Sequence, residues 1–188
     1  MPTPNDTQPT DAELVRRARR GSDEAFGRLV DRHGRRLLGL AASLLGNVAD
    51  AEDVVQETLA GALRGLGGFR GAASVKTWLT RILMNQVARH RRRQRIRQTV
   101  PLDPERDAGE GGRREPAGAT SRADIRMDVA AGLAGLAPEH RDVIVLREMQ
   151  QMSYEEMAAA LRVPRGTVES RLFRARQKLK DLLKDYLP

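Results

Sequence analysis

The sequence predicts an all-α protein in which two small helical domains are joined by a flexible linker. Aromatic residues make up only 3% of the chain. Alanine, leucine, arginine and glutamate, which favour helices, are abundant. Apolar residues recur at helical spacing through most of the chain. A single long stretch, Gln98–Arg122, instead carries prolines and glycines without any helical period, which is typical of a linker.

The bulk properties restrict the class of function. A net charge of +8 and an isoelectric point of about 10.8 favour an anionic partner such as nucleic acid. The absence of cysteine excludes disulfides and thiol ligands. The three histidines have no metal-ligand spacing, so we expect no metal and no cofactor. No apolar run approaches the roughly 18 residues of a membrane helix, and residues 1–10 read as a disordered tail rather than a secretion signal. We therefore expect a cytoplasmic protein.

Two helices are predicted before residue 46. Asp11–Arg20 reads as a short basic helix that starts from Thr10 or Asp11 and is broken by Gly21. Ser22 is a suitable N-cap for the next helix, because its hydroxyl can accept from a free N–H of the first turn. Apolar residues then recur to Leu45, which predicts one long helix, or two helices that meet near Gly34. In either case, we expect this segment to be a scaffold helix that packs in the hydrophobic core.

An acidic helix is predicted at Asp50–Leu63, with Asp50 as its cap. The segment contains no basic residue, which sets it apart in a cationic chain. It cannot face DNA, because phosphate would repel it. Acidic residues in a first turn can simply complement the helix dipole, although Glu57 lies too far along for that. The alternative is a docking face for a basic protein surface, and charge alone leaves the two readings about even.

A glycine-rich loop at 66–74 contains one aromatic residue, Phe69, and its spacing matches neither phosphate-loop motif. A helix resumes at about Ser74, and its lone Trp78 is best read as a core residue. From Arg81 onward the polar side of this helix becomes strongly basic. No acidic residue follows nearby in the sequence to neutralise this charge, so we favour contact with phosphates. The stripe comprises Arg81, Arg89, Arg91, Arg92, Arg93, Arg95 and Arg97.

Two more helices are predicted after the linker. Ala123–Leu136 returns to a helical period, and Pro138 then opens a helix at Glu139–Gln150. The run Val143–Leu146 could also be read as a strand. Its charged flanks and helical neighbours favour a helix.

The last third of the chain has the outline of a helix-turn-helix. Ser153 can cap a short helix, Arg162-Val163-Pro164 ends it, and a longer basic helix follows. Every third or fourth residue of that second helix is apolar and predicted to face inward: Val168, Leu172, Ala175 and Leu179. The opposite side carries Ser170, Phe173, Arg174 and Gln177. A basic helix alone is often only a solvated surface helix, but the preceding helix and turn favour docking in the major groove of DNA.

Four motifs, in order, resemble bacterial sigma factors of the sigma-70 family, extracytoplasmic-function (ECF) type. They are DAEDVVQET at 50–58, FRG with KTWLTRILMNQ between 69 and 86, LAPEHRDVIVLRE at 136–148, and SYEEMAAALRVPRGTVESRLFRAR at 153–176. The resemblance spans nearly all of residues 11–183. It implies a region 2 domain at 11–97, a linker at 98–122 and a region 4 domain at 123–188. It also implies binding to core RNA polymerase and promoter DNA, and control by an anti-sigma factor.

The resemblance also implies which residues carry each role. Docking on a basic coiled coil of the largest polymerase subunit falls to Asp50, Glu52, Asp53, Gln56 and Glu57. A flipped base and the strand backbone at the -10 element would meet Phe69, Arg70, Ser74, Lys76, Arg81, Asn85, Arg89 and Arg92. The -35 element would meet Arg165, Thr167, Ser170, Arg171, Phe173 and Arg174.

Two residues depart from the family pattern, which often has Asp or Asn at Arg89 and Lys or Arg at Glu169. We expect both departures to change which promoter sequence is preferred and to leave the function itself unchanged. The alternative function is a stand-alone helix-turn-helix regulator, which would not need the acidic helix or the unit from Phe69 to Asn85. An enzyme is the weakest reading, because no catalytic constellation can be assembled from these residues.

Overall fold

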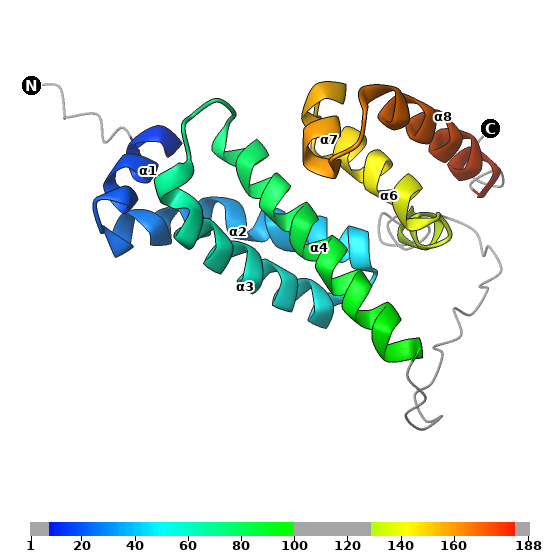
Figure 1. Ribbon diagram of the computed structural model, residues 1–188, viewed down its shortest axis with the longest axis horizontal. Helices are drawn as coiled ribbons and strands as arrows, with labels where there is room; N and C mark the ends of the chain where they lie inside the picture. The colour runs from blue at the N-terminus through cyan, green and yellow to red at the C-terminus, as the bar shows by residue number, and fades with distance from the viewer. Residues whose placement is uncertain (1–7, 100–128, 183–188) are drawn as a thin grey trace, which may run out of the picture.

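The computed structural model describes residues 8–99 and 129–182, and every regular element in these ranges is helical (Figure 1). The N-terminal half, residues 8–99, contains α1 (Asp11–Arg19), α2 (Asp23–Leu45), α3 (Val48–Gly65), a short 3-10 turn (Leu66–Gly68) and α4 (Val75–Thr99). The C-terminal half contains helical residues 129–134, α6 (Pro138–Ile144), a π-helical turn (Val145–Met149), α7 (Tyr154–Leu161) and α8 (Arg165–Leu182). The all-α prediction is therefore confirmed.

Helix starts follow the predicted caps with one exception. Thr10 caps α1 and Ser153 caps α7, each in a capping box with the glutamate three residues later. Ser22 caps α2, which is a single uninterrupted helix through Gly34. The prediction that Asp50 caps the acidic helix is wrong. Asn47 does so, with its side chain accepting from the Asp50 N–H, because α3 begins two residues earlier than the acidic run suggests.

The N-terminal half is organised around α2, which packs against α1, α3 and α4. Its inward residues Leu37, Leu40 and Leu44 are almost fully buried, and Leu83 of α4 joins them. Packing of α4 on α3 brings the arginine stripe next to the acidic helix.

In the C-terminal half, α6 and α7 pack against α8. Val168, Leu172 and Ala175 of α8 are buried as predicted, and Leu179 packs against the core from its edge. All four residues of the Val143–Leu146 run are buried within helical structure. Burial on all sides accounts for the strand-like appearance of that run in the sequence.

The helix-turn-helix turn lies where the sequence predicts it. Arg162 ends α7 in the left-handed conformation, with φ of 56°, and α8 begins immediately after Pro164. At its other end, α4 runs to Thr99, so the first two residues of the predicted linker are helical. The rest of the linker, most of the N-terminal tail and the start of the predicted 123–136 helix lie outside the described residues.

Candidate protein and nucleic-acid interfaces

The acidic face of α3 is largely open to solvent. Glu52, Asp53, Gln56 and Glu57 are all exposed. Within residues 8–99 and 129–182, neither Asp53 nor Glu57 forms an ion pair or a hydrogen bond through its carboxylate, although both lie opposite cationic side chains.

Asp50 differs from the other acidic residues of α3. Its side chain is only 26% exposed, and its carboxylate accepts from Asn47 Nδ2 and Gln94 Nε2, each at 3.0 Å. His90 Nε2 lies 3.4 Å from the same oxygen. Asp50 therefore joins the start of α3 to α4, while its acidic neighbours remain available to a partner.

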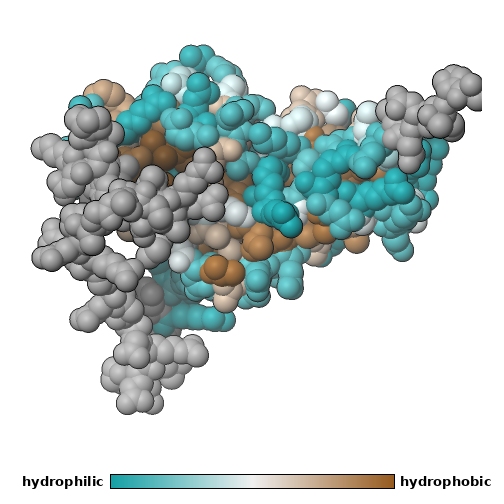
Figure 2. All heavy atoms as spheres, turned by 180° about the vertical axis from the view of Figure 1, so that it is seen from behind, coloured by the Kyte–Doolittle hydropathy of each residue, from teal (hydrophilic) through white to brown (hydrophobic). Residues whose placement is uncertain are grey.

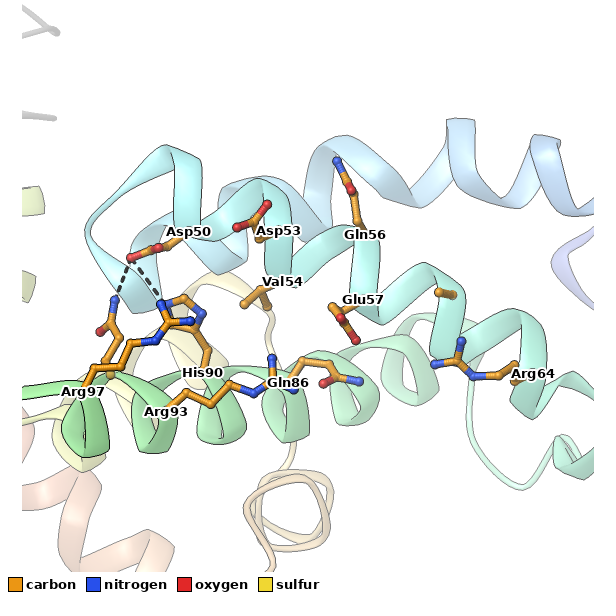
Figure 3. A pocket seen from close by; sticks show the side chains of 12 residues that line it. Asp50, Asp53, Val54, Gln56, Glu57, Arg64, Gln86, His90, Arg93 and Arg97 are labelled. Carbon is orange, nitrogen blue, oxygen red and sulfur yellow. Dashed lines mark hydrogen bonds and ion pairs between the residues drawn. The ribbon is translucent and has the colours of Figure 1, made fainter. Parts of the chain in front are cut away.

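A groove separates α3 from α4, with opposite charges on its two walls (Figure 3). Asp53 and Glu57 project from α3, and Arg93 and Arg97 project from α4. The expectation that nothing acidic lies near the arginine stripe is wrong. The acidic residues are about 40 positions away in the sequence, and only the packing of α4 on α3 brings them close.

The opposite edge of α3 borders a shallow hollow shared with α2. Leu38 and Val55 form its apolar floor, with Arg35 on the α2 side and Glu52 and Gln56 on the α3 side. Figure 2, which views the molecule from behind, shows a band of apolar side chains between hydrophilic ones on the half that carries these helices. The acidic face of α3 therefore lies between a charged groove and a partly apolar hollow.

The glycine-rich loop and the start of α4 form a compact unit. The Phe69 and Trp78 rings stack at a tilt, with centroids 4.9 Å apart and planes at 46°. Both rings are partly buried, so Trp78 packs at the edge of the core and supports Phe69. Ser74 accepts from the Thr77 N–H at 3.1 Å and so caps α4. Asn85 is half-buried on α4 and makes no side-chain hydrogen bond to any described residue.

The cations near this unit fall into two groups. Arg70, Arg89 and Arg92 are exposed, and Arg81 is half-buried. Lys76 instead donates from Nζ to the Gln150 carbonyl of the C-terminal half at 2.8 Å. Arg91 also turns toward that half and pairs with Asp142, so one member of the predicted phosphate stripe is already bound within the protein.

The second helix of the helix-turn-helix presents Ser170, Phe173 and Arg174 to solvent, as predicted. Phe173 is 67% exposed, the largest value among the exposed large apolar side chains of the described residues. Thr167 and Arg171 are half-buried at the edge of this face.

Arg165, at the start of α8, is held by two carboxylates. It donates to Glu155 at 2.6 Å and to Glu169 at 2.8 Å. The hydrogen bond to Glu169 and the nearby charge of Glu155 raise the pKa of the Arg165 guanidinium. The guanidinium also lies 5.9 Å from the centre of the Tyr154 ring. Arg165 is therefore fixed in position with its charge partly balanced.

Two family models match separate parts of the chain. The Sigma-70 region 2 family matches residues 29–97, and the Sigma-70 region 4 family matches residues 126–179. The RNA polymerase sigma-H factor of Pseudomonas aeruginosa is 35% identical over 96% of this chain and 97% of its own length. The chain belongs to the sigma-70 family of sigma factors, ECF type. The ECF RNA polymerase sigma-E factor of Salmonella typhimurium is also 35% identical, over 92% of this chain and 93% of that protein.

Two solved structures resemble this sigma factor in sequence and in fold. CnrH, in complex with the cytosolic domain of CnrY, is 33% identical over 93% of this chain and 97% of its own, with a TM-score of 0.66. The sigma factor RpoE of Bartonella quintana, in complex with the anti-sigma factor NepR, is 29% identical over 85% and 96%, with a TM-score of 0.65. These likenesses favour a sigma factor over a stand-alone helix-turn-helix regulator.

Sequence reasoning missed the residues through which the two halves of this sigma factor meet. Arg36, Arg141, Asp142 and Gln150 had no predicted role, yet each takes part in polar contacts within or between the halves. Their partners in the other half lie 51 to 114 positions away, so no local pattern reveals them. A weak signal was present at Asp142, a carboxylate immediately before a run of buried apolar residues, where an ion needs a partner.

Two searches of the described residues were negative. No group of three or more histidine, aspartate or glutamate side chains is placed to hold a metal ion in residues 8–99 and 129–182. In the same ranges, no helix combines the length and apolar character needed to cross a lipid bilayer.

Proposed function

We propose that this sigma factor binds core RNA polymerase through α3, recognises the -35 and -10 elements of promoters, and assists strand opening without catalysing a reaction itself. One observation carries the proposal. A chain with a net charge of +8 exposes Glu52, Asp53 and Glu57 on a single helix face. Phosphate would repel that face, so its partner must be a basic protein surface rather than DNA. Because the partners are the polymerase and the chromosome, we place its action in the cytoplasm.

The polymerase contact would extend to both sides of the acidic helix. A basic coiled coil lying on α3 could pair with Asp53 and Glu57, and its apolar side chains could enter the hollow over Leu38 and Val55. Apolar burial supplies affinity, while the charges fix orientation and speed encounter. Asp50 would contribute by holding the start of α3 against α4.

Recognition of the -10 element would use the loop and the first half of α4. A base that leaves the helical stack loses stacking energy, which an aromatic side chain and a hydrogen-bonding amide can offset. Phe69, supported by Trp78, and Asn85, with its amide unengaged by the described residues, provide these two groups. The cationic and polar side chains around them would hold the strand backbone: Arg70, Ser74, Lys76, Arg81, Arg89 and Arg92.

Recognition of the -35 element would use the outer face of α8. Arg174 can donate two hydrogen bonds to a guanine, and the exposed Phe173 can contact a thymine methyl. Ser170 and Arg171 complete the base-reading group, while Arg165 and Thr167 would position the helix on phosphates. Glu169 carries a second carboxylate oxygen beyond the one bound to Arg165, and this oxygen could accept from a cytosine amine.

An anti-sigma factor is the third partner that we propose. Both solved relatives described above were captured with a second protein: CnrH with the cytosolic domain of CnrY, and RpoE with the anti-sigma factor NepR. Their similarity to this chain in fold and sequence supports an equivalent partner here.

Charge reversal on α3 tests the proposal. The double variant Asp53→Lys and Glu57→Lys should lose co-purification with core polymerase, because two attractive contacts become repulsive. Its matched control, Glu24→Lys with Asp31→Lys, makes the same change of charge on exposed positions of α2. Retention of core by the α3 variant, at the level of the control, would show that docking occurs elsewhere.

A gel-shift experiment separates this function from its alternative. A stand-alone regulator binds its duplex operator by itself. The proposed sigma factor should bind promoter DNA well only when core polymerase is present.

A further inference from the structure

One large apolar side chain, Ile96, stands within the arginine stripe of α4 and has no part in the contacts proposed so far. It is 56% exposed. The arginines before and after it in the sequence are exposed as well: Arg92, Arg93, Arg95 and Arg97. A single exposed isoleucine is common on protein surfaces. Its meaning therefore depends on the surface that it shares with its neighbours.

Ile96 lies on the same side of α4 as the residues proposed to meet the -10 element. Steps of four, three and four residues, which return to the same side of an α-helix, separate the members of this outer row: Asn85, Arg89, Arg92 and Ile96. Asn85 is half-buried, and the other three are exposed. The proposed strand-binding face of α4 therefore continues along the helix and ends in an apolar side chain.

The other sides of this part of α4 are turned toward the protein itself. Val87 is fully buried in the core. Arg93 and Arg97 project into the groove shared with α3 (Figure 3). Arg91 is bound to a carboxylate of the C-terminal half. The outer row is therefore the side of α4 that is left to an external partner.

The charge of the outer row selects the kind of partner. Arg89 and Arg92 form no ion pair with any described residue. The basic protein surface that the acidic face of α3 would attract would be repelled here. DNA offers phosphates to the arginines, and it offers an apolar group, the C5 methyl of thymine, to an isoleucine. That methyl group lies in the major groove, so the row matches the phosphates and the major-groove edge of paired DNA.

The length of the row places Ile96 on the promoter. Ile96 lies about three turns, or about 16 Å, beyond Asn85 along α4. At 3.4 Å per base pair, this is about five steps of duplex. Asn85 is proposed to hold the flipped base, from which the opened strand runs toward the transcription start, so the DNA that stays paired lies upstream. Chain order agrees, because α4 is followed in the sequence by the half proposed to read the upstream -35 element.

Resting on the proposed function above, we infer that Ile96 is a further specificity-determining residue. Its side chain contacts the C5 methyl of a thymine in the duplex immediately upstream of the -10 element, about five base pairs from the flipped base. Arg89 and Arg92 hold the phosphates beside it. The same combination is proposed on α8, where the exposed Phe173 lies next to Arg174.

Removal of one methyl group from the DNA tests this contact. Deoxyuridine pairs as thymidine does and lacks only the C5 methyl. In a promoter selected from a random library, each thymine between the -35 and -10 elements is replaced in turn, on either strand. Binding of the parent holoenzyme should weaken about fourfold at one position close to the -10 element, which is the value of about one buried methyl group.

The variant Ile96→Ala should weaken binding to the thymine promoter by about the same factor and should lose its sensitivity to that methyl group. Alanine favours the helix and the position is exposed, so we expect the variant to fold. The protein change and the DNA change together should cost about fourfold, and not about sixteenfold, which is the product expected of two independent contacts.

Two further variants serve as controls. Val48→Ala shortens an apolar side chain that is 61% exposed on α3, and it should leave both the binding and the methyl effect unchanged. Arg92→Gln removes a proposed phosphate contact. It should weaken binding equally on the thymine and deoxyuridine promoters, because phosphates carry no base identity.

The outcomes separate this inference from the function on which it rests. The inference is overturned if no paired thymine shows a methyl effect that depends on Ile96. It is also overturned if Ile96→Ala weakens co-purification with core polymerase instead, since Ile96 would then meet protein. In both cases, promoter binding by the parent holoenzyme leaves the sigma-factor function intact. Failure of the parent protein and core to bind any promoter would overturn both.

Discussion

The charged helix faces of the two halves of this sigma factor differ in whether their side chains form ion pairs. In the N-terminal half, Asp53 and Glu57 face Arg93 and Arg97 across an open groove, and the acidic pair remains without ion pairs among the described residues. In the C-terminal half, two cations on α8 are matched by carboxylates within the domain. Arg165 is bound by Glu155 and Glu169, and Arg176 is bound by Glu148.

This difference suits the two proposed tasks. An unpaired charge on a rigid helix is available to a partner and costs little to desolvate against an opposite charge. A paired arginine is fixed in position but less able to attract phosphate over a distance. In α8, two flanking arginines are paired, while Arg174 is exposed beside Ser170 and Phe173, which favours reading bases over non-specific attraction. Under the proposed function, the acidic face of α3 would recruit polymerase, and the outer face of α8 would discriminate between bases at the -35 element.

The sharpest test of discrimination is Arg174→Ala. If Arg174 reads a guanine, its loss should cost about 1–3 kcal/mol at one base pair of the -35 element and relax the preference there. Arg176→Ala is the matched control, since it removes the same charge from a side chain bound to Glu148. Binding of holoenzyme to a set of -35 variants measures both. An equal loss on all sequences would make Arg174 a phosphate contact instead.

In the N-terminal half, Asn85→Ala should slow strand opening by about tenfold, because loss of one specific contact to a flipped base is worth about 1.4 kcal/mol. Closed-complex binding should change little. Permanganate footprinting of the -10 region reports opening, and a gel shift with holoenzyme reports binding.

A promoter template with a premelted bubble provides the control for Asn85→Ala. The variant should recover on it, since the opening step has been bypassed. Equal losses in binding and in opening would mean that Asn85 supports the fold rather than the open strand.

Asp11→Asn should affect stability alone, and by the smallest amount. Burial by itself would raise the pKa of Asp11, but hydrogen bonds and charge from Arg32 and His33 outweigh it and hold the pKa below 3.8. The carboxylate therefore stabilises the fold above pH 3.8, and that contribution is lost as the pH falls through the lowered pKa. The variant should lose at most about 1 kcal/mol at neutral pH, because such partly exposed pairs are weak.

Denaturant unfolding at several pH values measures this loss. The gap between parent and variant should close in acid, while core binding stays equal at neutral pH. A gap that persists unchanged below the lowered pKa would rule out the ionised carboxylate as its source.

Local features of the fold could be read from the sequence because their causes are local. The Ser153 cap, the end of α7 near Pro164 and the inward stripe from Val168 to Leu179 each depend on residues within about one or two turns. The prediction that Asp50 caps α3 was wrong for a reason that is also local. Asn47 competes for the same role and lies three residues before Asp50, where an N-cap side chain reaches the backbone.

The parts of the candidate site that depend on packing between helices could not be predicted from the sequence. The outward position of Phe173 and Arg174 follows from helical period alone. By contrast, the pairing of Arg91 with Asp142 across 51 positions, and the approach of Arg93 and Arg97 to the acidic helix, depend on how α4 crosses its neighbours. Helical periodicity states which side of a helix is polar, but not which polar surface it meets.

Transcription from a random promoter library shows whether this protein directs core polymerase to promoters. Core polymerase with this protein should give run-off transcripts whose templates share two sequence elements at a fixed separation, and core alone should give none of this pattern. Asp53→Lys with Glu57→Lys should abolish the pattern. Selection of a duplex element by the protein alone, with the templates chosen by core polymerase left unchanged, would contradict a role as a sigma factor.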